Sequence, residues 1–108
     1  MTETGITRGS NNLFADLGFP DAEERQTRLW LAYTLNQALA GRGLTQAASA
    51  ALLGITQPKV SALQRYKLAG FSLERLMGFL TSLDLDIEIV IRKKRRSHPA
   101  GQITVTAE

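Results

Sequence analysis

The stretch from Thr45 to Arg65 reads as two short helices joined by a tight turn, and it restricts the fold more than any other segment. Thr45 and Thr56 stand just before the two helices, where a threonine hydroxyl can accept from the free amides of a first turn. Pro58 falls in the first turn of the second helix, where its missing amide costs nothing. Gly54 supplies a turn conformation that other residues adopt only with strain. The sequence therefore predicts two capped helices a few residues apart.

The residues inside the pair follow the pattern of a helix-turn-helix, in which two helices cross steeply at small side chains. Ala50 would lie at the crossing, while Val60 and Leu63 face inward and hold the second helix to a core. Ser49 departs from the pattern, because a larger apolar residue is commoner at that place. The alternative is an ordinary helical hairpin without a role in DNA binding. The turn glycine and the two caps favour the helix-turn-helix, whose second helix enters the major groove of DNA.

The outward positions of this second helix define the surface that would read DNA. Glutamine can bond adenine through two hydrogen bonds, lysine and arginine favour guanine or phosphate, and alanine can touch a thymine methyl. Gln46, at the start of the preceding helix, is placed to hold a backbone phosphate together with the helix amides. Arg42 and Lys67 flank the motif as expected phosphate contacts. The predicted DNA-contact residues are Arg42, Gln46, Thr56, Gln57, Lys59, Ser61, Ala62, Arg65 and Lys67.

Charge is distributed unevenly along the 108 residues, although the formal net charge is only +3. Between Leu39 and Leu73 the chain carries basic residues and no acid, and this segment coincides with the helix pair. Because DNA is a dense array of negative charge, the pattern favours an anionic partner. A second basic run at residues 92–96 can be read either as a solvated face or as a contact for an anion.

A long helix is predicted to begin at Asp21, which can cap its first amides. It should end at about Gly41 or Gly43, where glycine can adopt the left-handed end conformation. Trp30 and Tyr33 form either a second buried face or a protein–protein contact. They lie off the apolar stripe, which recurs at helical spacing and comprises Leu31, Leu35, Ala38 and Leu39.

A further helix is predicted after Ser72, and its apolar residues would close the core over the helix pair. At the other end of the chain, residues 1–12 read as a flexible tail. The apolar residues between Leu13 and Phe19 should dock either on the domain's own core or on a partner, because exposing them would be costly. These elements predict a mainly helical domain.

From Asp86 to Arg92 the sequence alternates, which predicts a half-buried strand with Ile87, Ile89 and Ile91 on one side. A lone strand leaves backbone groups unpaired, so it needs a partner. The partner is the same strand of a second subunit, the C-terminal run of residues 102–106, or the sheet edge of another protein. We favour the first, with the three isoleucines forming a dimer interface. The domain then comprises residues 13–92, followed at residues 93–108 by a basic tail that can hold a short strand.

Residue types exclude several classes of function. There is no cysteine, and the one histidine, His98, lies in the basic tail, so neither a disulfide framework nor a metal site is expected. Without a glycine-rich phosphate loop or an acidic pair on a shared core face, we expect no enzyme and no cofactor. No apolar run approaches the roughly 18 residues that cross a bilayer, and the N-terminus lacks the layout of a secretory signal. A soluble cytoplasmic protein is the expectation.

The stretch TQAASAALLGITQPKVSALQRYKLAGFSLERLMGFLTSLDLDIEIVIR resembles the Cro/repressor-type (XRE) helix-turn-helix family. With the upstream NLFADLGFPDAEER, residues 12–92 also resemble the antitoxins of bacterial HigBA-type toxin–antitoxin pairs. The resemblance implies a lambda-repressor-like bundle of four to five helices with a C-terminal β-strand used in pairing or dimerisation. It assigns DNA contact to Gln46, Gln57, Lys59, Ser61 and Arg65. The chain departs from the family at Gln64-Arg65-Tyr66, where many relatives carry Arg or Glu followed by Arg-Gly.

The resemblance also implies partners. Members of the subgroup are homodimers that bind a palindromic operator of double-stranded DNA and repress their own operon, and they neutralise a RelE-like (HigB-type) ribonuclease toxin. Such a protein acts on the nucleoid in the bacterial cytoplasm. Two other functions stay open at this point. The chain is also consistent with a stand-alone or phage-type repressor without a toxin, and with an adaptor that binds only protein.

Overall fold

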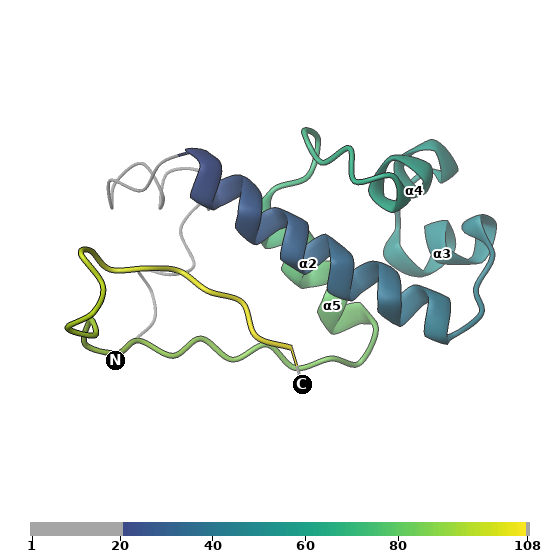
Figure 1. Ribbon diagram of the computed structural model, residues 1–108. Coiled ribbons are helices and arrows are strands. Elements are labelled where there is room, and N and C mark those ends of the chain that lie inside the picture. Colours follow the sequence, from purple (N-terminus) through teal and green to yellow (C-terminus); the bar gives the residue numbers. More distant parts are fainter. Residues whose placement is uncertain (1–20, 108) are drawn as a thin grey trace.

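The computed structural model describes residues 21–107, and this part of the chain forms a bundle of four helices. They are α2 (Asp21–Gly41), α3 (Gln46–Leu53), α4 (Gln57–Gln64) and α5 (Leu73–Ser82). The long α2 lies beside α5, and the short α3 and α4 form a lobe near the C-terminal half of α2 (Figure 1). The predicted helical fold is confirmed. The predictions for the tail at residues 1–12 and for the apolar segment at residues 13–19 lie outside the described residues.

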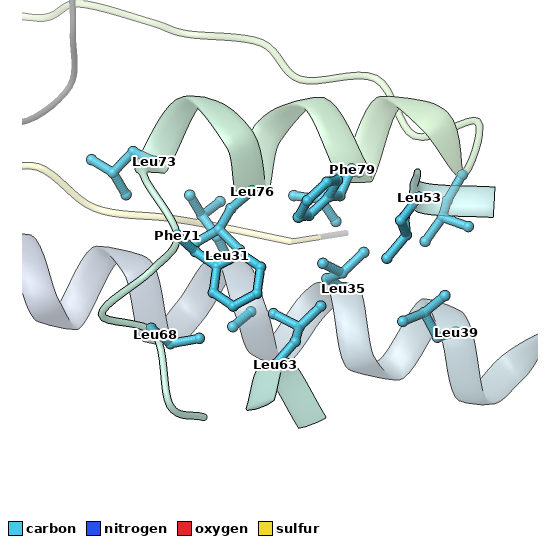
Figure 2. Packing of buried hydrophobic residues seen from close by; sticks show 13 residues of the cluster. Leu31, Leu35, Leu39, Leu53, Leu63, Leu68, Phe71, Leu73, Leu76 and Phe79 are labelled. Atoms are coloured by element: carbon cyan, nitrogen blue, oxygen red, sulfur yellow. The ribbon is translucent and has the colours of Figure 1, made fainter. Parts of the chain in front are cut away.

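One hydrophobic core joins the four helices (Figure 2). The predicted stripe of α2 supplies Leu31, Leu35 and Leu39, and α5 faces it. Leu53 of α3 and Leu63 of α4 reach into the same cluster. Burying a leucine side chain contributes about 1.5–3 kcal/mol. The helix pair is therefore held from one side, which leaves its other side to the solvent.

Three of the four predicted N-caps are confirmed; the one predicted at Asp21 concerns a side chain outside the part of the chain that the structure describes. The hydroxyl of Thr45 accepts from the amide of Ala48 at 3.1 Å, and that of Thr56 accepts from Lys59 at 3.4 Å. Ser72 caps α5 in the same way, with its hydroxyl 3.1 Å from the amide of Arg75. Each cap satisfies an amide that has no partner inside its helix, which sets where the helix starts.

Each of the four helices is followed by a residue with a left-handed backbone. After α2 and α3 these are Gly43, with φ of 65°, and Gly54, with φ of 72°, as the sequence predicts. After α4 and α5 they are Tyr66, with φ of 60°, and Asp84, with φ of 64°. A non-glycine residue in this region is uncommon, and neither Tyr66 nor Asp84 was predicted from the sequence to adopt it.

The strand predicted for residues 86–92 is not confirmed. Residues 83–107 contain no helix and no strand, and no backbone hydrogen bond joins residues 86–92 to residues 102–106. The isoleucines are exposed, Ile91 at 75%. The physical reason is that alternation sets which side chains share a face, whereas a strand also requires a backbone partner.

The C-terminal run instead lies against the helices. The amide of Ile103 donates to a carboxylate oxygen of Glu23 at 3.3 Å, and Ile103 and Val105 pack against the core. The irregular segment of residues 83–107 extends along one side of the bundle, away from the lobe of α3 and α4 (Figure 1). No helix within residues 21–107 is long and apolar enough to cross a membrane.

Candidate nucleic-acid interface

The crossing of α3 and α4 is as tight as the sequence predicts. Ser49 is fully buried and Ala50 is 7% exposed, while the turn at Gly54 lets the amide of Ile55 donate to the carbonyl of Ala50 at 3.0 Å. The Ser49 hydroxyl has no hydrogen-bond partner within the described part of the chain. Serine therefore suits the crossing by its size, but its buried hydroxyl is a cost that a small apolar residue would avoid.

Helix α4 has one buried side and one open side. Val60 and Leu63 are fully buried, and Gln57, Lys59 and Arg65 are exposed. This is the arrangement that a groove-reading helix needs, because the core holds one side while polar groups project from the other.

The remaining predicted residues on α4 are less open. Ser61 and Ala62 are half-buried, and Ala62 packs against the core cluster. Thr56 is exposed, although its hydroxyl already serves as the cap of α4. The exposed predicted positions within α4 are therefore Gln57 and Lys59, and Arg65 follows directly after the helix.

Lys59 is oriented by the loop that leads to α5. Its ammonium lies 5.6 Å from the centroid of the Phe71 ring, and a Cβ built at Gly70 would be 3.5 Å from the same nitrogen. A cation over an aromatic ring at an exposed site is worth about 0.5–1 kcal/mol. Because the ammonium is turned toward the loop at Gly70 and Phe71, contact with a phosphate is favoured over contact with a base edge.

Gln46 is tied to the far end of α4. Its Nε2 donates to Oε1 of Gln64 at 2.9 Å, so the first residue of α3 and the last residue of α4 hold each other. No local signal in the sequence predicts this bond, because Gln46 and Gln64 lie 18 positions apart. The bond leaves Gln46 exposed beside the free amides of α3, which is where an anion would bind.

Asn36 on α2 and Arg42, just after α2, bond to the ends of α4 and α5. Nδ2 of Asn36 donates to the carbonyl of Leu63 at 3.1 Å, at the end of α4. Nη2 of Arg42 donates to the carbonyl of Leu83 at 2.9 Å and pairs with Asp84 at 3.2 Å. From the sequence Arg42 was predicted only as a phosphate contact, and its bond to the end of α5 was not predicted. In the folded chain the guanidinium is engaged within the bundle, and its contact with DNA stays a prediction.

Basic residues gather where α4 ends. Nε of Arg65 donates to the carbonyl of Ser61 at 3.4 Å, and the exposed Lys67 follows two positions later. No acid occurs anywhere between Leu39 and Leu73, so nothing on this lobe neutralises them. The other basic run, at residues 92–96, lies at the opposite end of the molecule and does not extend this surface (Figure 1).

The outward side of α2 carries an aromatic pair. The rings of Trp30 and Tyr33 meet edge to face with centroids 6.0 Å apart, and the residues are 48% and 47% exposed. Of the two readings of this pair, a second buried face does not fit such exposure, and the reading as a protein–protein contact stays a prediction. Among residues 21–107 no three histidine, cysteine, aspartate or glutamate side chains come together in a way that could hold a metal ion.

Comparison with known proteins agrees with this geometry. A family model described as "Helix-turn-helix domain" matches residues 13–92. A solved structure named provisionally as an XRE family transcriptional regulator is 64% identical in sequence, with a TM-score of 0.79. The match covers 82% of this chain and 100% of that one. A search of curated proteins finds no match.

Proposed function

The chain belongs to the XRE family of helix-turn-helix proteins, and from this premise we propose that it is a sequence-specific DNA-binding transcriptional repressor. Helix α4 would enter the major groove with Gln57 and Arg65 toward the bases, while Gln46, Lys59 and Lys67 hold phosphates. One observation carries the proposal. The exposed side of α4 is polar and basic, and it stands on a lobe without any acid. The proposal assigns binding and no catalysis.

The test is selection from random DNA followed by gel shifts. The protein is incubated with a library of random palindromic duplexes at moderate salt, and the bound pool is sequenced. A repressor of this kind selects one motif, and its affinity falls steeply with salt because phosphate contacts release counterions. Binding without any sequence preference would contradict the proposal, and the absence of DNA binding would favour the alternative of an adaptor that contacts only protein.

We propose further that the protein binds its operator as a homodimer. One recognition helix reads only a few base pairs, whereas two helices about 34 Å apart read a palindrome. The exposed row of Ile87, Ile89 and Ile91 supports a second copy as the partner, because two such runs would pair their backbones and bury the isoleucines.

Substitution of Ile89 tests the dimer. Ile89→Asp would place a charge in the paired interface, so the sedimentation mass should fall from that of a dimer to that of a monomer. Arg95→Asp introduces the same aspartate in an exposed part of the tail and serves as the control. A dimer that survives Ile89→Asp would move the interface to another surface.

The finer part of the proposal concerns a toxin. From the resemblance of residues 12–92 to HigBA-type antitoxins, we propose that the protein neutralises a RelE-like ribonuclease and represses its own operon. The half-exposed aromatic pair Trp30 and Tyr33 supports a protein partner, since aromatic residues are enriched in interfaces. Such a protein would act at the nucleoid in the cytoplasm.

The toxin proposal is tested with the product of the adjacent gene. Co-expression should relieve growth arrest by a small basic ribonuclease encoded there, and the double variant Trp30→Ala/Tyr33→Ala should lose that relief while keeping operator binding. If the adjacent gene encodes no such protein, the chain is a stand-alone or phage-type repressor, and the DNA-binding proposal is unaffected.

A further inference from the structure

The four residues with a left-handed backbone, one after each helix, differ in how readily their residue type adopts that conformation. Gly43 and Gly54 adopt this backbone without a steric cost. Asp84 is a residue type that tolerates it, and its carboxylate pairs with Arg42 at 3.2 Å. Tyr66 is the exception, because a bulky side chain in this conformation crowds its own backbone.

The backbone around Tyr66 explains why the conformation is required. The amide of Tyr66 donates to the carbonyl of Leu63 at 3.1 Å, and the amide of Lys67 donates to that of Ala62 at 2.9 Å. These are the two bonds of a Schellman turn, which satisfy the last carbonyls of α4 and reverse the chain. Glycine is the usual residue at the left-handed position of this turn. The turn alone therefore does not explain a tyrosine at this position.

Within the described residues, no hydrogen bond and no aromatic or cationic contact of the Tyr66 side chain offsets this cost. Tyr66 is 40% exposed and lies outside the hydrophobic core cluster. Within the described residues its hydroxyl has no hydrogen bond and its ring has no aromatic or cationic partner. A strained residue with an exposed side chain is expected where that side chain meets something outside the fold.

The neighbours of Tyr66 indicate what it meets. It stands between Arg65 and Lys67, both exposed, at the end of the helix that reads DNA, on a lobe without acids. We propose that Tyr66 is a DNA-backbone contact, with its phenol donating a hydrogen bond to a phosphate oxygen and its ring lying against the adjoining sugar. This inference rests on the proposed DNA-binding function. It adds a contact that glycine at the same turn would not provide.

Two variants of Tyr66 test the inference by separating stability from affinity. Tyr66→Phe removes only the hydroxyl, and we expect operator affinity to fall about tenfold, the loss typical of one hydrogen bond to a charged group. The salt dependence should be unchanged, because no charge is removed. Tyr66→Gly relieves the backbone, so the melting temperature should rise while affinity falls at least as far. A residue with only a structural role would not move these two quantities in opposite directions.

The duplex for these measurements is the one that the wild-type protein selects from a random palindromic library. Tyr33→Phe removes the same hydroxyl from the outward side of α2 and should leave operator affinity unchanged. If Tyr66→Phe binds as tightly as the wild type, or if Tyr66→Gly gains stability without losing affinity, the assignment of Tyr66 is overturned. If the wild type selects no motif, the proposed function itself fails, and the two failures are thereby distinguished.

Discussion

The lobe of α3 and α4 and the run of residues 83–107 differ in where their backbone hydrogen bonds come from. In the lobe, the donors and acceptors belong to the helices themselves and to caps three residues away, such as Thr45 and Thr56. The C-terminal run has an equally clear alternating pattern, yet residues 86–92 find no backbone partner in residues 102–106. Local patterns therefore specify helices directly, but they specify a strand only when a partner is supplied.

The same two regions differ in how they bury apolar side chains. Leu63 of the lobe is fully buried in the hydrophobic core cluster (Figure 2), whereas Ile91 is 75% exposed. Burial of Leu63 stabilises the single chain. Ile91 can contribute to stability only in an assembly that buries it. Substitutions in both regions test this contrast, and the largest effect is expected in the lobe.

Leu63→Ala should destabilise the fold by about 2–5 kcal/mol, because it leaves a cavity at the centre of the core. Ile91→Ala removes a comparable side chain from the exposed run and should change the stability of the monomer by less than about 0.5 kcal/mol. Denaturant unfolding at low protein concentration measures both. Equal losses in the two variants would mean that the C-terminal run is buried in the solution monomer, and the contrast would fail.

Gln57→Ala addresses the reading surface and should cost about 1–3 kcal/mol of discrimination between operator and a mismatched site, since a base contact is lost. The fold should be unaffected, because Gln57 is exposed at the start of α4. Competition gel shifts measure the discrimination. Gln102→Ala, in the C-terminal run, is the matched control and should leave it unchanged. An unaltered preference in Gln57→Ala would show that another side of α4 faces the groove.

Ser49→Ala should stabilise the protein by about 1 kcal/mol, because it removes a buried hydroxyl that has no partner among the described residues. Ser72→Ala is the same chemical change with the opposite expectation. It removes the cap of α5 and should destabilise by about 1 kcal/mol. Thermal melts of the two variants decide the matter. A loss of stability in Ser49→Ala would indicate that the hydroxyl is satisfied in solution.

The smallest effect is expected for the basic residues. Lys59→Ala should reduce the slope of log affinity against log salt by about 0.9, the value for one phosphate contact. Arg42→Ala should reduce it less, because its guanidinium already bonds to Leu83 and Asp84. Titrations at several salt concentrations compare the two. A larger change for Arg42 would mean that it leaves the bundle when DNA binds.

Much of the candidate site could be predicted because its determinants are local. The start of α3, the turn at Gly54 and the start of α4 each depend on residues within a few positions of one another. The inward positions of Val60 and Leu63 follow from helical periodicity, and both are fully buried. The half-buried state of Ala62 could not be predicted in the same way, because it depends on how far the neighbouring core extends around α4.

The antitoxin role and the dimer concern contacts with other molecules, which a single chain does not contain. Both are suggested by the sequence resemblance. The exposed Trp30 and Ile89 are compatible with such contacts and mark the surfaces where experiments should begin.

The helices, their caps and the family could be predicted from the amino-acid sequence, because they depend on periodicity and on bonds between near neighbours. Which side chains meet across the chain could be seen only in the folded structure. Gln46 bonds Gln64, Arg42 bonds Leu83, and Ile103 bonds Glu23, across separations of 18, 41 and 80 residues. Such pairs form because packing brings together segments that are distant in the sequence. The strained Tyr66 belongs with them, since its backbone conformation becomes visible only where α4 ends and the chain must turn back.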